Sequence, residues 1–258
     1  MNVLVLGGYG LIGLEITALL YRQGHAVTAL ARDAAHGRAL LPGVTWIGTD
    51  IARLTTPAAW TPHLAGIDAV INAAGALQSS GRDNVTAVQR HAIMALIPAC
   101  TQSGISKFVQ ISAPGAAPEA ATEFMASKGA ADDALRLSPL DWVILKPGLV
   151  IAPAAYGGTS LLRALAAFPL VQPVVLPHAR IQTVDVADVA SATARALTDA
   201  ALSRQTFDLV EPTPASLQDI VLKFRRWLGF KAPLRMIALP KPVAHLVAKL
   251  ADAAGQLG

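Results

Sequence analysis

Three glycines near the start of the chain are spaced so that backbone amides can face a bound anion. Gly7, Gly10 and Gly13 follow the apolar run at residues 2–6 and open an amphipathic stretch. The first glycine permits a tight turn, the second lets a ligand approach the backbone, and the third allows close helix–strand packing. Amides at the helix N-terminus favour a diphosphate, so the segment predicts a dinucleotide-binding loop. The loop residues expected to contact the cofactor are Gly7, Tyr9, Gly10, Leu11, Ile12 and Gly13.

The end of the next predicted strand carries a charge that bears on the choice of cofactor. Arg32 stands 19 residues beyond Gly13, close to the place where an NAD-selective fold has an acid for the ribose 2′-hydroxyl. A guanidinium there favours a 2′-phosphate through its charge and its bidentate geometry. Asp33 follows directly and keeps NAD open as the alternative. The sequence therefore predicts NADP(H), with NAD as the second candidate.

Apolar runs alternate with helical patterns along the first 148 residues. Such runs are typical of strands buried on both faces, and the alternation implies βαβ units with right-handed crossovers. We therefore predict an α/β fold with a doubly wound parallel sheet of the Rossmann type. Strands are expected at residues 2–6, 26–30, 44–47, 69–72, 108–112 and 142–146, and helices at residues 11–23, 34–40, 57–64, 83–102 and 119–137.

The chain changes character after residue 148. Prolines 153, 169, 173 and 177 predict a long irregular segment around a short helix at 160–168. We expect one domain over 1–258, with a core at 1–148 and a small interleaved C-terminal lobe at 149–258 that holds the substrate. Further strands are expected at 180–184 and 206–210, and further helices at 186–198, 215–228 and 242–256, with Asp185 as an N-cap. The helix at 242–256 has one apolar stripe that predicts docking onto the body, with membrane or partner contact as the alternative.

Composition excludes several classes of function. Hydrophobic residues make up 53% of the chain and charged residues 15%, which suits a buried sheet and also a protein that rests against a membrane. The net charge of +4 is spread without a basic block, so we expect no nucleic-acid partner. Cys100 is the single cysteine and the histidines lack ligand spacing, so no disulfide or metal site is expected. No apolar run is long enough to span a bilayer, and the predicted location is the cytoplasm, with the membrane surface as an alternative.

Later motifs resemble those of the short-chain dehydrogenase/reductase superfamily. They are Gly48-Thr49-Asp50-Ile51, Asn72-Ala73-Ala74-Gly75, Ile111-Ser112, Lys128 and Leu145-Lys146-Pro147-Gly148. Together they are most similar to the atypical extended members, which are epimerase/dehydratase-like and include the NmrA-like proteins and a complex I accessory subunit. The resemblance implies that Lys128 binds the nicotinamide ribose and that Ser112 orients a substrate. It also implies cofactor contacts from Asp50, Ile51, Ala73, Ala74, Gly75, Lys128, Pro147 and Gly148.

One residue departs from the reactive pattern of that superfamily. Active members have a tyrosine four residues before the lysine, on the same side of a helix, and this chain has Phe124 there. Phenylalanine has no hydroxyl, and loss of a general acid–base typically lowers the rate by ~10²–10⁴. Ser112, Ser127 and Tyr156 are the other candidate proton donors. Asp132 and Asp133 are adjacent on a helix and are not expected to form a catalytic pair.

Three functions follow, in this order. The first is an NADP(H)-binding protein with weak or absent oxidoreductase turnover, acting as a redox sensor or in assembly. The second is an NADPH-dependent reductase of a small or lipid-like carbonyl or quinone, with its pocket in the apolar segment 149–177. The third is a nucleotide-sugar epimerase or dehydratase, which Phe124 makes least suitable. Some bacterial relatives with this pattern continue into a small membrane domain, so a membrane-associated C-terminal extension or partner is a further expectation.

Overall fold

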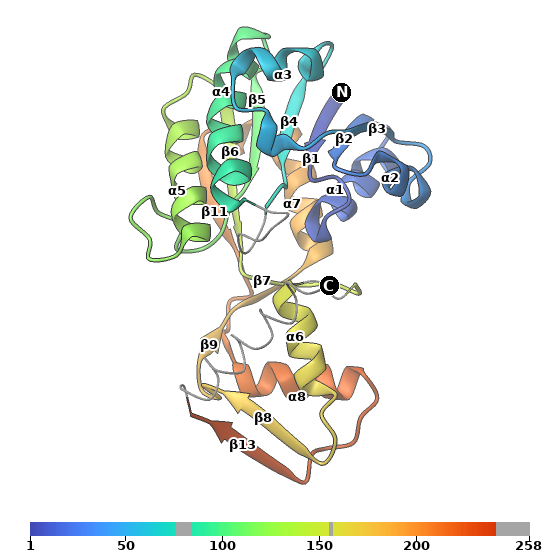
Figure 1. Ribbon diagram of the computed structural model, residues 1–258, viewed down its shortest axis with the longest axis vertical. Coiled ribbons are helices and arrows are strands. Elements are labelled where there is room, and N and C mark those ends of the chain that lie inside the picture. Colours follow the sequence, from blue (N-terminus) through green and yellow to red (C-terminus); the bar gives the residue numbers. More distant parts are fainter. Residues whose placement is uncertain (76–83, 155–156, 241–258) are drawn as a thin grey trace. The chain divides into compact units, whose positions relative to one another are not determined.

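The computed structural model describes residues 1–75, 84–154 and 157–240 (Figure 1). The chain divides into two compact units. Unit 1 comprises Met1–Gly148 and Asp185–Leu209, and unit 2 comprises Leu149–Val184 and Val210–Gly258. The predicted organisation as one domain with an interleaved lobe stays a prediction.

Unit 1 is built on a seven-stranded sheet in the order β11-β6-β5-β4-β1-β2-β3, in which all neighbours are parallel. The order of the strands reverses between β1 and β4, and in doubly wound sheets ligands bind at the carboxyl ends of the strands beside this reversal. The predicted Rossmann-type fold is therefore confirmed. The strands are β1 (Asn2–Leu6), β2 (Ala26–Ala31), β3 (Thr45–Gly48), β4 (Ala69–Asn72), β5 (Lys107–Ile111), β6 (Asp141–Pro147) and β11 (Gln205–Leu209).

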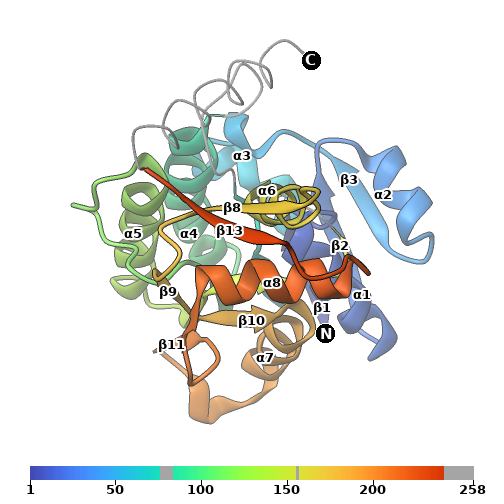
Figure 2. The same cartoon turned by 90° about the horizontal axis from the view of Figure 1, so that it is seen from below.

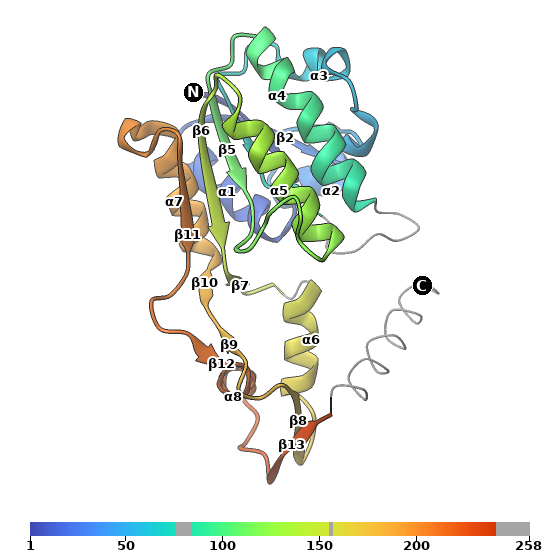
Figure 3. The same cartoon turned by 90° about the vertical axis from the view of Figure 1, so that its left-hand side faces the viewer.

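Helices cover both faces of this sheet (Figure 3). On one face α1 packs against α7, and on the other α4 packs between α3 and α5. Asp185 caps α7 as expected, because its carboxylate accepts a hydrogen bond from Ala187 N at 2.8 Å. The helices are α1 (Leu11–Arg22), α2 (Ala34–Leu40), η1 (Ile51–Arg53), α3 (Pro57–Leu64), the π-helix η2 (Ala87–His91), α4 (Ala92–Gln102), α5 (Glu123–Arg136), α7 (Val186–Thr198) and η3 (Ala200–Leu202).

The inner strands of unit 1 are buried on both faces, whereas the edge strands β3 and β11 are partly exposed. Val3, Leu4, Val5 and Leu6 are all 0% exposed, so successive side chains of β1 meet protein on either side of the sheet. A strand buried in this way shows an unbroken apolar run and no alternation with polar residues. This burial explains why the sequence located the strands to within one or two residues.

Unit 2 is smaller and contains more strands than the sequence indicated. Its apolar core is formed by Ala166, Val174, Ile220, Val221 and Phe224. The stretch expected to be irregular around one helix contains two strands, β7 and β8, and β8 pairs with β13, which was not predicted (Figure 2). The elements are β7 (Leu149–Ile151), α6 (Gly157–Ala166), β8 (Val171–Val175), β9 (Arg180–Ile181), β10 (Thr183–Asp185), β12 (Ala215–Ser216), α8 (Leu217–Trp227) and β13 (Arg235–Leu239).

Pro173 is the reason that β8 escaped prediction. Proline cannot donate to a strand ladder and is therefore read as a strand breaker in the sequence. In the structure Pro173 lies in a two-stranded sheet opposite Ile237, where β8 has a neighbour on one side only. An edge strand tolerates proline because the missing N–H faces away from the ladder.

No helix among the described residues is long and apolar enough to cross a membrane. The predicted helix at 242–256 lies outside the described residues.

We predict that Gly13→Ala destabilises unit 1 far more than an alanine at a glycine with free space. A Cβ at Gly13 would lie 2.1 Å from the carbonyl oxygen of Gly7, whereas a Cβ at Gly48 would meet nothing closer than 3.4 Å. Neither glycine has a positive φ, so the comparison isolates the steric contact. Overpacking of this kind typically costs about 3 kcal/mol. Urea unfolding of both variants measures the difference, and equal stabilities would contradict the close packing.

Candidate cofactor site and buried lysine cluster

The glycine loop leaves the first amides of α1 without a side chain above them. Gly7 has φ +72°, and its carbonyl oxygen accepts from Gly10 N at 2.9 Å, which closes a tight turn after β1. Gly10 is the N-cap of α1 and contributes no capping side chain. Because the first turn contains no acidic residue, its amides and the positive end of the helix dipole can face an anion.

The loop after β4 lies directly against this turn. A Cβ at Gly7 would lie 2.9 Å from the Cα of Ala74 and 3.0 Å from the carbonyl oxygen of Ala73. Asn72 holds this loop, because its side-chain oxygen accepts from Ala74 N at 3.1 Å and its amide donates to Gln110 at 2.9 Å. The structure therefore brings Ala73 and Ala74 beside the glycine loop.

Tyr9 connects the glycine loop to the end of β2. Its ring stacks on Trp46 with centroids 6.2 Å apart and meets His36 edge-on at 5.3 Å. Its hydroxyl accepts from Asp33 N at 3.3 Å. The neighbouring Arg32 is exposed at the end of β2, close in sequence to this contact. Trp46 was missed in the sequence because an aromatic residue inside a strand indicates packing and not a site.

The carboxylate of Asp33 is engaged by the next helix. One of its oxygens accepts from the amides of Ala35 and His36, both at 2.9 Å, and so caps α2. Both capping bonds are accepted by the same oxygen, Oδ1. The role of Arg32 and Asp33 in cofactor choice stays a prediction.

Asp50 and Ile51 are placed by the short helix η1. The Asp50 carboxylate accepts from Ala52 N at 3.1 Å and caps η1, so its capping role is real. Ile51 is only 9% exposed and belongs to the main apolar core. The contacts of both residues with an adenine stay predictions.

Lys128 is a buried base on α5, near the carboxyl ends of β4 and β5. It is 6% exposed, and its Nζ donates to Ile111 O at 2.8 Å. A Cβ on Gly75 would lie 3.8 Å from this Nζ, so the loop after β4 also reaches Lys128. Burial lowers the pKa of Lys128 to about 8, and the negative charge of Asp132 opposes that shift. The ammonium is therefore poised to lose its proton just above neutral pH.

Asp132 completes this cluster, and sequence reasoning missed it. It is 0% exposed, and its Oδ2 accepts from Ser112 Oγ at 2.6 Å and lies 4.0 Å from Lys146 Nζ. Its Oδ1 is buried and has no hydrogen-bond partner within the described ranges. Burial raises the pKa of Asp132, while the Ser112 hydrogen bond and Lys128 oppose that shift. The four-residue spacing from Lys128 was the available signal, since it puts both side chains on one helix face.

Asp133 has a separate role, as expected for a neighbour on a helix. Its carboxylate pairs with Arg136 at 2.6 Å in a partly exposed ion pair. The prediction that the two adjacent carboxylates do not act together agrees with this geometry.

Phe124 lies beside Lys128 on α5, and its correspondence to the tyrosine of the superfamily stays a prediction. Its ring centroid lies 5.6 Å from Lys128 Nζ, one helical turn away. The Ser127 hydroxyl is directed to other groups. It donates to Phe124 O at 3.1 Å and to the side-chain oxygen of Gln89 at 3.3 Å. Ser112 is thus the candidate donor that the structure joins to the lysine cluster. Tyr156 lies outside the described residues.

Pro147 and Gly148 follow β6 at the same edge of the sheet. Pro147 is the last residue of β6, and Gly148 N donates to Leu209 O at 3.1 Å. Their position at a carboxyl end is the one that the fold uses for ligands. Their contact with a nicotinamide stays a prediction.

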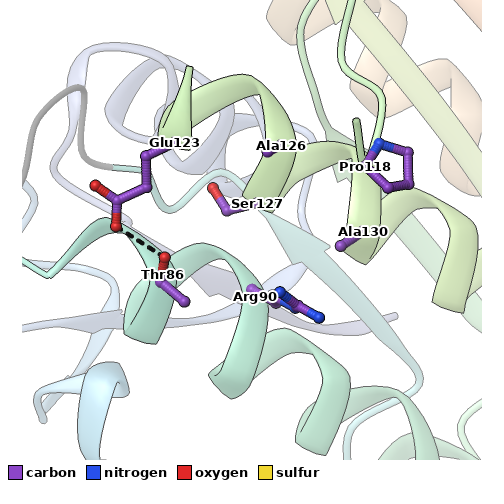
Figure 4. Close-up of a pocket in the computed structure, with 7 residues that line it drawn as sticks. All are labelled: Thr86, Arg90, Pro118, Glu123, Ala126, Ser127 and Ala130. Atoms are coloured by element: carbon purple, nitrogen blue, oxygen red, sulfur yellow. Dashed lines mark hydrogen bonds between the residues drawn. The ribbon is translucent and has the colours of Figure 1, made fainter. Parts of the chain in front are cut away.

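A small pocket lies between α5 and η2 (Figure 4). Its volume is about 140 Å³, and Thr86 donates to Glu123 at 2.8 Å on its wall. The pocket is lined by Thr86, Arg90, Pro118, Glu123, Ala126, Ser127 and Ala130. It is too small for a dinucleotide, since ligand pockets usually measure about 300–1,000 Å³. Among the described residues, no group of three histidine, cysteine or acidic side chains could hold a metal ion.

Comparison with known proteins agrees with this geometry. A family model described as NAD(P)H-binding matches residues 7–200. The NAD(P)H azoreductase of Xenophilus azovorans is 25% identical over 237 residues, which cover 92% of this chain and 77% of that protein. The photosystem II assembly factor Ycf39 of Synechocystis is 33% identical over 147 residues, which cover 57% of this chain and 44% of that protein.

A solved structure shows the same fold. The UDP-glucose 4-epimerase of Thermus thermophilus, in complex with NAD, superposes with a TM-score of 0.74 at 24% identity. The match covers 95% of this chain and 93% of the epimerase.

We predict that Lys128 makes stability rise with pH in alkaline solution. Between about pH 8 and its usual pKa of 10.5, the folded protein has released the Lys128 proton while the unfolded chain still binds it. The unfolded state then binds more protons, so the free energy of unfolding increases by up to about 1.4 kcal/mol per pH unit. Urea unfolding of wild type and Lys128→Met across this window gives the difference. A difference that does not change with pH would refute the shifted pKa.

Asp132→Asn provides the matched test of the cause. Removing the carboxylate removes the charge that raises the pKa of Lys128. The rise in stability should then begin at a lower pH than in the wild type.

Proposed function

Because this chain belongs to the NAD(P)H-binding family, we propose that it holds NADP(H) and acts as a redox sensor or in assembly, with weak or absent oxidoreductase turnover. The proposal of weak or absent turnover rests on Phe124. Its ring centroid lies 5.6 Å from Lys128 Nζ, and it carries no hydroxyl. A bound nicotinamide cofactor supplies a hydride, but reduction of a carbonyl also needs a proton donor beside the acceptor.

The residues present fit the cofactor. A Cβ at Gly7 or Gly13 would clash with neighbouring backbone, so the close packing of the loop depends on glycine, and Gly10 leaves the first amides of α1 without a capping side chain. We propose that amides of the Gly7–Gly13 loop hold the diphosphate and that Lys128 binds the nicotinamide ribose. The remaining proposed contacts are Tyr9, Leu11, Ile12, Asp50, Ile51, Ala73, Ala74, Gly75, Pro147 and Gly148.

The preference for NADP(H) over NAD(H) rests on Arg32. The competing acid, Asp33, is engaged as the cap of α2 by two amides at 2.9 Å. A guanidinium at the end of β2 is well suited to a 2′-phosphate.

An assembly role is supported by one relative. The part of this chain that matches the photosystem II assembly factor is 33% identical to it. A protein that binds the cofactor and does not consume it could report the redox state to a partner through its occupancy. We therefore favour a partner protein over a small-molecule substrate as the molecule on which the chain acts.

A reductase is the second candidate, and the Ser112–Asp132 pair favours it. Asp132 holds Ser112 Oγ at 2.6 Å, and a protonated Asp132 could return a proton to Ser112 after that hydroxyl had protonated an acceptor. The azoreductase relative, which matches 92% of this chain, points in the same direction. The acceptor would be a small or lipid-like carbonyl or quinone. A nucleotide-sugar epimerase or dehydratase ranks third, because it needs the missing tyrosine hydroxyl.

We propose a cytoplasmic location, with the membrane surface as the second candidate. The mean hydropathy of +0.47 supports contact with an apolar surface.

Arg32→Glu is expected to weaken NADPH binding about 100-fold, because it removes charge-assisted hydrogen bonds to the 2′-phosphate and adds repulsion. NADH binding should change much less. Fluorescence titration with both cofactors measures the two dissociation constants, and Arg22→Gln is a control at an exposed arginine elsewhere in unit 1. An equal loss for both cofactors would show that Arg32 does not read the 2′-phosphate.

Phe124→Tyr is expected to leave NADPH affinity unchanged and to raise NADPH oxidation with a carbonyl or quinone panel by about 10²–10⁴. The new hydroxyl would stand one turn from Lys128, where it could donate a proton. Stopped-flow and steady-state absorbance of NADPH measure the gain.

Rapid NADPH oxidation by the wild type would overturn the sensor proposal and favour the reductase. In that case Ser112→Ala should abolish turnover and retain NADPH binding. If Ser112→Ala remains fully active, the reductase with this donor is also excluded.

A further inference from the structure

One edge of unit 2 carries large apolar side chains in solvent, and we propose that it binds the surface of an anionic lipid bilayer. Phe168 is 48% exposed, Leu170 67%, Phe230 44% and Leu234 82%. We call these four residues the apolar tip. Trp227, at the end of α8, is 61% exposed beside them in sequence. Clustered exposed apolar groups of this size normally mark a surface that binds something.

The apolar tip is one continuous feature formed by two loops. The loop after α6 carries Phe168 and Leu170, and the loop after α8 carries Phe230 and Leu234 (Figure 1). The amide of Leu234 donates to Leu170 O at 2.8 Å, and the two loops lead into the paired strands β8 and β13. The four side chains therefore come from segments that are bonded to each other.

A buried arginine holds the two loops in this form. Arg225 is 6% exposed, and its guanidinium donates to Ala166 O at 2.9 Å, to Phe168 O at 2.7 Å and to Lys231 O at 2.6 Å. Three carbonyls from both loops are thus tied to one side chain in α8. The same guanidinium lies 5.6 Å from the centroid of the Phe230 ring, so it also positions one side chain of the apolar tip.

Leu170 adds a second sign of a constrained loop. Its φ is +61°, in the left-handed region that non-glycine residues rarely adopt. The chain thus keeps a leucine where glycine would be less strained, and leaves 67% of it exposed. A local fold that holds a strained, exposed leucine points to a role for that side chain outside the fold.

The charges around the apolar tip have one sign. From residue 220 to 240 the chain has the bases Lys223, Arg225, Arg226, Lys231 and Arg235 and no acid. All of these except Arg225 are exposed. Residues 160–176 also contain no acid. The surface therefore attracts a layer that is anionic on its outside and apolar beneath.

A bilayer with anionic lipids meets both conditions at once. Apolar side chains enter the headgroup and acyl boundary, while lysine and arginine contact anionic headgroups. The four side chains expose between 44% and 82% of their surface and do not line a groove, so they need no partner of matching shape. The inference goes beyond cofactor binding and rests only on the membrane-surface location proposed above.

Vesicle flotation with the full chain tests the proposal. The wild type is expected to float with vesicles of equimolar phosphatidylcholine and phosphatidylglycerol, to bind pure phosphatidylcholine much less, and to detach as salt is raised. Leu234→Gln should weaken binding about tenfold, and Arg226→Gln or Lys231→Gln about fivefold each. Leu137→Gln is the matched control, because Leu137 is 89% exposed in unit 1. Far-UV circular dichroism and urea unfolding of each variant show that its fold is retained.

Each outcome decides the matter. No flotation by the wild type overturns both the membrane-surface location and the apolar tip. Flotation that Leu234→Gln and Leu137→Gln leave equally strong keeps the location and overturns the apolar tip. A wild-type dimer that Leu234→Gln makes monomeric, without lipid binding, assigns the surface to a second copy and overturns the proposal. Cofactor binding is read separately and is unaffected by all three results.

Discussion

The close approach of backbone to backbone at the glycine loop is the constraint on which the rest of unit 1 depends. Gly13 lies so near Gly7 that a single methyl group at Gly13 would meet the Gly7 carbonyl at 2.1 Å, and a methyl group at Gly7 would meet the chain after β4 at 2.9 Å. This contact determines where α1 begins and which amides remain unpaired at its start. It also brings the carboxyl ends of β1 and β4 together, at the reversal of strand order where a doubly wound sheet binds its ligand.

The electrostatics of α5 follow from burial in the same region. Desolvation disfavours the charged forms of Lys128 and Asp132. The charge of each residue favours the charged form of the other and so opposes the pKa shift that burial causes. The Phe124 ring packs one turn from Lys128 and carries no hydroxyl. In the function proposed above, the chain therefore binds the cofactor without the usual proton donor. Ser112 is the hydroxyl that the network retains.

Unit 2 is stabilised by a different principle. Its core is small, and a single guanidinium, that of Arg225, joins three backbone carbonyls that no strand ladder pairs. Such a cross-link holds loops without covering them with side chains. The exposed bases and apolar side chains of these loops can therefore form a surface. In unit 1 most large apolar side chains are buried against the sheet.

The sequence by itself determined the Rossmann-type sheet, the glycine loop and the loss of the tyrosine hydroxyl. These features are local, since buried parallel strands appear as apolar runs and a loop or helix spacing needs only neighbouring residues. Only the tertiary structure decided that Asp132 is buried against Ser112, because these residues come from a helix and a strand end that meet through packing. It also decided the pairing of β8 with β13, since a proline is compatible with a strand only when its other edge is unpaired.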